Sequence, residues 1–117
     1  HFVLNKKYFF DLDAIKILGA NGRMKNPGDV WAINTQPLNG SHTATFPEQL
    51  VEQIVLCGSP KGGVVFDPFL GTGTTWIVSD RLGRSCIGFE INQEFFDFAQ
   101  SRFKESRKFE QCQLPIS

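Results

Sequence analysis

Residues 67–75 combine glycines, threonines and one acidic residue in a pattern that suits a nucleotide-like ligand. Gly71 and Gly73 can adopt positive φ, which lets a ligand approach the backbone closely. Thr74 and Thr75 open an expected helix, and a helix amino terminus presents N–H groups that have no partner within the helix. The sequence therefore predicts a ligand site at this loop.

A second polar group follows at a characteristic distance. Glu90 ends the short segment 84–90 and lies nineteen positions after Gly71. An acid about 20 residues beyond a glycine loop is typical of a carboxylate that accepts hydrogen bonds from ribose hydroxyls. Alone, Glu90 would be read as a solvated acid at a strand end, but with the glycine loop at this spacing we favour the ribose role.

Two phosphate-binding alternatives fit the loop poorly. The dinucleotide fingerprint needs a small residue where the helix packs on the strand, and Trp76 is far too large for that position. A P-loop ends in Gly-Lys-Ser or Gly-Lys-Thr, and there is no lysine between Lys61 and Lys104.

Alternating strand and helix signals must position these residues. The apolar run at 64–66 predicts a strand, residues 76–82 a helix that ends at Gly83, and the segment up to Glu90 a second strand. Two such units imply a parallel sheet flanked by helices, with the ligand at the carboxyl ends of the strands. The fold class is therefore α/β.

A helix is also expected just before this unit. Thr45 and Glu48 are spaced as in a capping box and Pro47 suits the first turn, so the helix should begin here and run through Cys57. Its period places one set of apolar residues on the buried face: Leu50, Val51, Ile54 and Val55.

The ends of the chain give weaker signals. Residues 1–10 favour a strand or an aromatic edge segment, residues 11–18 one or two helical turns capped by Asp11 and closed by Gly19, and residues 21–28 a basic loop. Asn92 should cap a last helix before a frayed tail at 111–117. An aromatic stripe on that helix is expected to pack in the core: Phe95, Phe96, Ala99 and Phe103.

Composition describes one globular domain. The 117 residues carry no net charge and are 41% hydrophobic, and no apolar run approaches the ~20 residues of a membrane span. The three widely spaced cysteines do not match a disulfide framework or a zinc site, and they fit a reducing, cytoplasmic location. Zero net charge argues against an obvious nucleic-acid-binding domain, and the basic stripes at 6–25 and 102–108 fit solvated faces better than phosphate contacts.

The string Asp-Pro-Phe-Leu-Gly-Thr-Gly-Thr-Thr at 67–75 closely resembles the cofactor loop of S-adenosylmethionine-dependent DNA amino-methyltransferases. Gly-Asp-Val-Trp at 28–31 and His-x-Ala-x-Phe-Pro at 42–47 are similar to further elements of that family. The resemblance implies part of a Rossmann-like methyltransferase fold with S-adenosyl-L-methionine as cofactor and no metal. The order of the motifs matches the permuted class, which places the cofactor loop near the carboxyl terminus.

The resemblance also implies roles for individual residues. Glu90 would hold the ribose, and His42 is as well explained by an ordinary loop histidine as by a site role. The remaining residues would surround the methionine end of the cofactor: Thr45, Phe46, Pro47, Asp67, Phe69, Gly71, Thr72, Gly73, Thr74 and Thr75.

The catalytic element of that family is missing from this sequence. The family orients the flipped base with an Asp/Asn/Ser-Pro-Pro-aromatic tetrapeptide, whereas no two of the six prolines here are adjacent. We therefore expect residues 29–117 to be the cofactor-binding part of an enzyme that methylates the exocyclic amine of cytosine or adenine in double-stranded DNA. Residues 1–28 would be a remnant of a target-recognition or connecting region, and an amino-terminal half or a partner chain would carry the catalytic motif. The alternatives are a non-catalytic relic that serves as an interaction module and, less favoured, a methyltransferase for small molecules or RNA.

Overall fold

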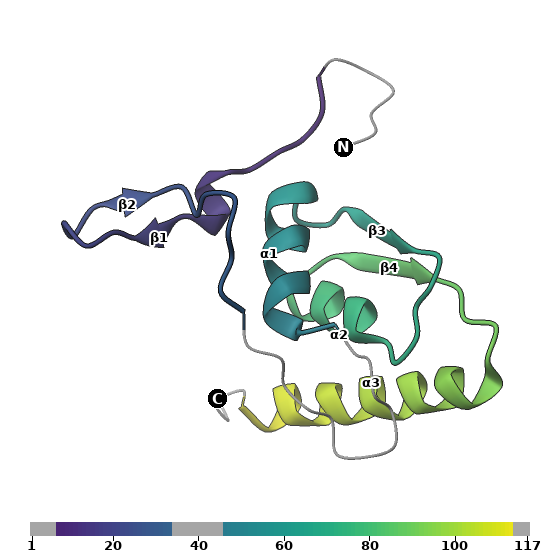
Figure 1. Ribbon diagram of the computed structural model, residues 1–117. Helices are drawn as coiled ribbons and strands as arrows, with labels where there is room; N and C mark the ends of the chain where they lie inside the picture. Colours follow the sequence, from purple (N-terminus) through teal and green to yellow (C-terminus); the bar gives the residue numbers. More distant parts are fainter. Residues whose placement is uncertain (1–6, 34–45, 114–117) are drawn as a thin grey trace.

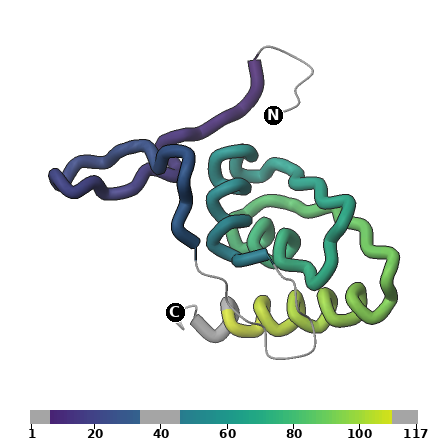
Figure 2. Tube along the Cα trace, in the orientation of Figure 1, coloured from purple at the N-terminus to yellow at the C-terminus, as the bar shows by residue number. Residues whose placement is uncertain are grey.

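The computed structural model describes residues 7–33 and 46–113, in which a short amino-terminal arm precedes an α/β unit (Figures 1 and 2). The elements in chain order are the 3-10 helix η1 (Asp13–Ile15), β1 (Ile17–Leu18), β2 (Met24–Lys25), α1 (Glu48–Gly58), β3 (Val64–Asp67), α2 (Thr74–Arg81), β4 (Ser85–Gly88) and α3 (Gln93–Gln113).

The predicted parallel sheet is confirmed by β3 and β4. The two strands pair in parallel with Val64 opposite Ser85 and Asp67 opposite Gly88, and α2 forms the connection between them. Both strands therefore end at the same edge, and beyond it the Phe89 N–H donates to the carbonyl of Asp67 at 3.0 Å. This edge is where the glycine loop and Glu90 meet.

The core lies between the sheet and two helices. Val51 and Val55 of α1 are buried against Val78 of α2, and Val65 of β3 packs on this cluster. The predicted buried face of α1 is correct for Val51 and Val55 and wrong for Ile54, which is 53% exposed. Ile54 borders an open apolar pocket beside β3, because no further described element covers that side of the helix.

Helix α3 packs on the outside of α2 (Figure 1). The side chain of Asn92 accepts hydrogen bonds from the Glu94 and Phe95 N–H groups at 2.9 and 3.4 Å, so the predicted cap is confirmed. Ala99 is fully buried, and Phe103 stacks on Trp76 with ring centroids 4.1 Å apart. Ala99 and Phe103 of the expected stripe therefore pack inward, while Phe95 and Phe96 are half-buried. Residues 111–113, expected in a frayed tail, still belong to the helix.

The start of α1 differs from the capping-box expectation. The helix begins at Glu48, with Pro47 in the cap position. A capping box needs the glutamate at the third helical position, whereas Glu48 occupies the first. Its carboxylate instead pairs with Arg81 and Arg102. Thr45, the other member of the expected box, lies outside the described residues, as does His42.

The amino-terminal arm is a hairpin where the sequence suggested helix and loop. The cap position of η1 is held by Leu12 and not by Asp11 as predicted, although the Asp11 side chain accepts from the Ala14 N–H at 3.1 Å. Residues 17–18, however, form β1 antiparallel to β2, and Gly19 starts the hairpin turn instead of closing a helix. Ile17 and Leu18 are both exposed, so the apolar residues that suggested a helix do not pack against the core here. Of the expected strand at 1–10, residues 7–10 have no regular structure and the rest lies outside the described range.

Within the part of the chain that the structure describes, no helix is both long and apolar enough to cross a membrane.

Candidate functional site

Hydrogen bonds within the glycine loop, and from the loop to the end of β4, hold the segment between β3 and α2 in place. The Asp67 carboxylate accepts from the Phe69 N–H at 3.0 Å, and the Leu70 N–H donates to the Phe89 carbonyl at 2.8 Å. Leu70 is buried over Gly88, where a side chain would come within 2.7 Å of it. The loop is thereby fastened to the end of β4 before it enters α2.

Glu90 joins this loop to the second strand. One carboxylate oxygen accepts from the Gly71 N–H and the other from the Asn92 N–H, both at 2.8 Å. The side chain is half-buried, and each oxygen keeps lone-pair capacity for a further donor. Glu90 can therefore order the loop and still accept hydrogen bonds from ligand hydroxyls.

The two glycines of the loop face different surroundings. Gly71 has φ 55° and open space where a side chain would begin, whereas Gly73 has φ 80° and its missing side chain would lie 2.8 Å from the Cβ of Ala99. Gly71 thus leaves room on the solvent side, and Gly73 lets α3 approach the loop. The space that a Gly73 side chain would need is thus occupied by α3, and the cofactor role of Gly73 stays a prediction.

A pocket of about 230 Å³ opens between α1 and β3 beside the loop. Three of the predicted site residues line it: Phe46 before α1, Asp67 at the end of β3, and Thr75 in the first turn of α2. Its remaining walls are mostly apolar: Leu50, Val51, Ile54, Val55, Val65 and Phe66. The amino-terminal ends of two helices thus border one hollow that has a carboxylate at its rim.

Other predicted site residues point elsewhere. The carbonyl and hydroxyl oxygens of Thr72 and the hydroxyl of Thr74 accept hydrogen bonds from Arg102 of α3. Phe69 is 86% exposed at the tip of the loop, and Pro47 caps α1. The structure therefore gathers Phe46, Asp67 and Thr75, joins Glu90 to Gly71, and turns the side chains of Thr72 and Thr74 toward α3.

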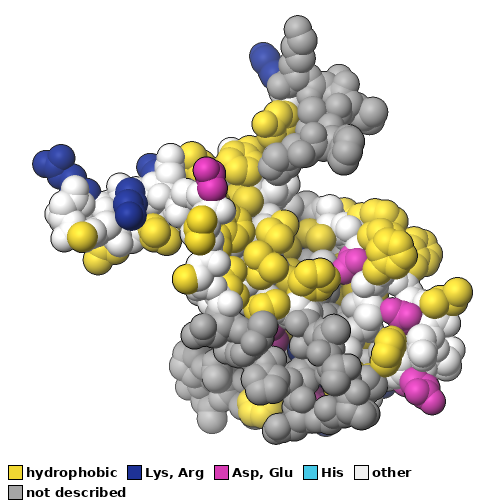
Figure 3. All heavy atoms as spheres, in the orientation of Figure 1, with side chains coloured by type: hydrophobic (Ala, Val, Ile, Leu, Met, Phe, Trp, Pro, Cys, Tyr) yellow, Lys and Arg dark blue, Asp and Glu magenta, His cyan; other side chains and the backbone are white. Residues whose placement is uncertain are grey.

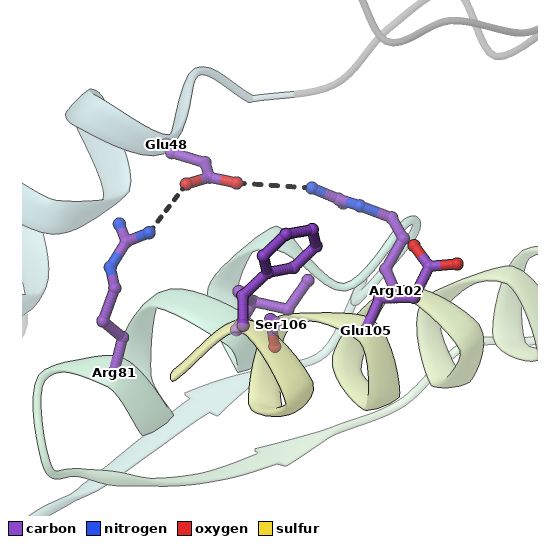
Figure 4. Close-up of a pocket in the computed structure, with 7 residues that line it drawn as sticks. Glu48, Arg81, Arg102, Glu105 and Ser106 are labelled. Atoms are coloured by element: carbon purple, nitrogen blue, oxygen red, sulfur yellow. Dashed lines mark hydrogen bonds and ion pairs between the residues drawn. The ribbon is translucent and has the colours of Figure 1, made fainter. Parts of the chain in front are cut away.

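Sequence reasoning missed Arg102 and the use of Glu48. Arg102 was grouped with a basic stripe of solvated residues, but its side chain is 14% exposed and pairs with Glu48 (Figure 4). It also donates hydrogen bonds to the glycine loop. Burial lowers the pKa of Arg102, and the neighbouring Glu48 carboxylate opposes that effect. A signal existed in the sequence, because positions 99 and 102 lie on one helix face and Ala99 belongs to the expected core stripe.

The two cysteines whose side chains the structure describes, Cys57 and Cys86, are free thiols with raised pKa values. Cys57 is buried, and its pKa is raised chiefly by that burial. Burial, assisted by the Asp67 carboxylate, raises the pKa of Cys86 to about 11. Over the described ranges, no group of three His, Cys, Asp or Glu side chains is placed to hold a metal ion.

Comparisons with known proteins agree on one family. A family model described as DNA methylase matches residues 2–101. The Type II methyltransferase M.SmaI of Serratia marcescens is 44% identical over 104 residues, which cover 87% of this chain and 36% of M.SmaI. The chain thus spans about a third of the length of the curated relatives it matches.

Solved structures give the same fold. The M1.HpyAVI–SAM complex is 27% identical with a TM-score of 0.57, over 82% of this chain and 43% of that one. The cytosine-N4-specific PvuII DNA methyltransferase is 23% identical with a TM-score of 0.66, over 86% of this chain and 40% of that one. The second likeness supports the fold alone, a partial Rossmann-like α/β unit.

Proposed function

Because the chain belongs to the DNA methylase family, we propose that it forms the S-adenosylmethionine-binding part of a DNA methyltransferase. The single observation that carries the proposal is the hydrogen bond from the Gly71 N–H to Glu90, which brings the glycine loop and the acid to one edge of the sheet. A similar protein, M1.HpyAVI, has been solved as a complex with S-adenosylmethionine. An acid that can accept hydrogen bonds from ribose hydroxyls, beside an open glycine loop, supports this choice of cofactor.

In this proposal the cofactor lies along the edge formed by the loop and the pocket. Glu90 accepts hydrogen bonds from the ribose hydroxyls, and Gly71 leaves the loop open to the ligand. Phe46, Asp67 and Thr75 surround the methionine end, where Asp67 can accept from the cofactor ammonium. The helix amino termini that border the same pocket favour the cofactor carboxylate.

The reaction we propose is transfer of the cofactor methyl group to an exocyclic amine of cytosine or adenine in double-stranded DNA. The cofactor would supply the methyl group of its sulfonium sulfur and become S-adenosylhomocysteine, while the amine nitrogen would gain that methyl and release a proton to solvent. Such a transfer depends on proximity and orientation of the two reactants. Residues of this chain bind the donor, and we assign the base-orienting groups to polypeptide outside this sequence, since no two prolines here are adjacent.

An exposed face of the sheet supports a partner of this kind. Four apolar side chains on β3, on β4 and just beyond β4 are each 54–63% exposed: Val64, Phe66, Ile87 and Phe89. Figure 3 shows apolar side chains gathered over α1 and this sheet. A patch of this kind marks an interaction surface. We propose that the part carrying the catalytic tetrapeptide packs here, as an amino-terminal half or as a partner chain inside the cell.

The hairpin arm is the proposed DNA contact within this chain. Arg23 and Lys25 are exposed, and Figure 3 shows basic side chains along the projecting arm. Lysine and arginine on such an arm can neutralise phosphates. We therefore assign residues 1–28 to target recognition or its connection, and residues 29–117 to cofactor binding.

Replacement of Glu90 by alanine tests the proposed function. Loss of a carboxylate that accepts two hydroxyl hydrogen bonds should cost on the order of 1.5–3 kcal/mol of binding free energy, or roughly a 10–150-fold weaker Kd. The measurement is calorimetric titration with S-adenosylhomocysteine, and Glu94→Ala is the matched control because Glu94 is an exposed acid four residues further on.

We expect Glu94→Ala to bind as the unaltered protein does. If the protein bound S-adenosylhomocysteine and Glu90→Ala left the affinity unchanged, the ribose assignment would be wrong. If the unaltered protein bound none, the non-catalytic interaction module would be the better reading.

A further inference from the structure

We propose that Arg102 is a positioning residue that clamps the glycine loop in its binding shape, a role that rests on the proposed cofactor function. Arg102 lies on α3, yet one guanidinium nitrogen, Nη1, reaches three oxygens of the loop. It donates to the Thr72 carbonyl at 2.7 Å, the Thr72 hydroxyl at 3.3 Å and the Thr74 hydroxyl at 3.2 Å. The other, Nη2, lies 3.5 Å from Glu48 of α1.

These contacts fix one peptide unit at both ends. Arg102 binds the carbonyl of Thr72, and the N–H of the next residue, Gly73, donates to the Leu70 carbonyl at 3.0 Å. That second bond closes the turn in which Gly71 takes its positive φ. Release of the Thr72 carbonyl would free this peptide to rotate, and the turn would lose its fixed orientation.

The loop is therefore held from two sides. Glu90 binds the Gly71 N–H from the end of β4, while Arg102 binds the next residue from α3. The Glu90 contact borders the proposed cofactor path, but Arg102 does not line the pocket formed by Phe46, Asp67 and Thr75. Arg102 thus acts on the ligand through the loop and not by contact with it.

Glu48 completes the arrangement. Its two carboxylate oxygens bind Arg102 and Arg81, and the three side chains border a cavity of about 350 Å³ between α1, α2 and α3 (Figure 4). Arg81 is 40% exposed and Arg102 only 14% exposed. A largely buried guanidinium needs its acceptors, and arginine can bridge several oxygens in a fixed fork that lysine cannot reproduce.

The matched variants are Arg102→Ala, Arg102→Lys and Arg81→Ala in the full-length protein. Arg81→Ala removes the other partner of Glu48 and leaves the hydrogen bonds between Arg102 and the glycine loop in place. The first measurement is amide hydrogen exchange of peptides spanning residues 70–76 without ligand, and the second is the Kd for S-adenosylhomocysteine. Thermal unfolding checks that each variant is folded.

We expect Arg102→Ala to speed exchange at residues 71–75 and to weaken the Kd, each by about tenfold or more, because charge-assisted hydrogen bonds are lost. Arg102→Lys should fall between, and Arg81→Ala should stay within about twofold of the unaltered protein in both measurements.

A folded Arg102→Ala with unchanged exchange and unchanged Kd overturns the proposal. If that variant fails to fold, Arg102→Lys decides the matter, and unaltered behaviour of the lysine variant overturns it equally. Absence of binding by the unaltered protein would instead refute the proposed function, and the exchange measurement without ligand would still show whether Arg102 holds the loop.

Discussion

At the scale of single residues, glycines with the same backbone handedness do different work in this chain. Gly62, Gly71 and Gly73 all have φ between 55° and 80°. Only at Gly73 would a side chain collide with another element, since Ala99 of α3 lies 2.8 Å from the position of the added carbon. Glycines with the same conformation therefore have different roles: Gly62 lies in a connection, Gly71 in an open loop and Gly73 at a packing contact.

Alanine substitutions should rank these three positions. Gly62→Ala and Gly71→Ala pay only the backbone cost of positive φ, about 1 kcal/mol of unfolding free energy, while Gly73→Ala adds overpacking of about 1–3 kcal/mol. Cofactor affinity should fall at Gly71 and stay near normal at Gly62. Chemical denaturation and titration with S-adenosylhomocysteine measure the two effects, and equal destabilisation at all three positions would contradict the packing role of Gly73.

The thiol of Cys86 predicts how stability changes with pH. Burial and the Asp67 carboxylate raise its pKa from 9.0 to about 11 in the folded protein. The folded state therefore holds this proton more tightly than the unfolded state. The resulting stability is fully present below pH 9 and is lost as the pH rises toward 11.

Thermal denaturation at pH 8, 9, 10 and 11 should show a steeper decline for the unaltered protein than for Cys86→Ala. The comparison uses only the slope of thermal stability against pH, because the alanine variant also loses stability at every pH from its missing side chain. Parallel declines of the two proteins would mean that Cys86 does not titrate in this range.

At the scale of elements, basic residues of the hairpin arm and of α3 make different contacts. On α3, Arg102 binds the glycine loop and Arg107 pairs with Asp80 at 2.7 Å. On the arm, Arg23 and Lys25 are exposed, whereas Lys16 pairs with Asp13. Lys104 and Lys108 of α3 are exposed as well, but the arm presents Arg23 and Lys25 on a projecting hairpin (Figure 3), which is the element we propose to contact the phosphate backbone.

Salt dependence of DNA binding should locate the contribution of the arm. Arg23→Ala and Lys25→Ala should each reduce the slope of log affinity against log salt by about 1, as expected when one phosphate contact is lost. Lys16→Ala, whose charge is already paired, serves as the control and should change the slope less. Fluorescence anisotropy with mixed-sequence duplex DNA measures this, and identical slopes for all variants would remove the arm from the DNA interface.

At the scale of the whole molecule, a hydrogen-bonded glycine loop lies beside an exposed apolar face of the sheet. The two-stranded sheet buries Val65 against α1 and α2 but leaves Phe66 and Phe89 in edge-to-face contact at its exposed surface. Two strands with one open apolar face make a marginal sheet by themselves. We therefore expect stability and activity to depend on the polypeptide that covers this face.

The 117-residue chain alone should methylate no DNA. In the proposed function it binds the methyl donor, but its sequence has no Pro-Pro tetrapeptide to orient a flipped base, and a misplacement of about 1 Å can cost roughly a hundredfold in rate. A tritium-transfer assay on duplex DNA, with and without an amino-terminal segment that carries the tetrapeptide, provides the comparison. Robust methylation by the isolated chain, at a rate lowered by Glu90→Ala, would reveal a catalytic element within these residues.

The sequence by itself determined the strand, loop and helix around Gly71, the parallel partner strand, the Asn92 cap and the acid at the second strand end. These features follow from hydrophobic period, turn residues and the spacing of consecutive elements, all of which are local in the chain. Only the tertiary structure decided which residues from distant parts of the chain are in contact. Arg102 reaches Thr72 across 30 positions and Glu48 across 54, and Gly73 meets Ala99 only because α3 packs on the loop. Contacts between residues this far apart depend on how whole elements pack, which no local pattern of residues specifies.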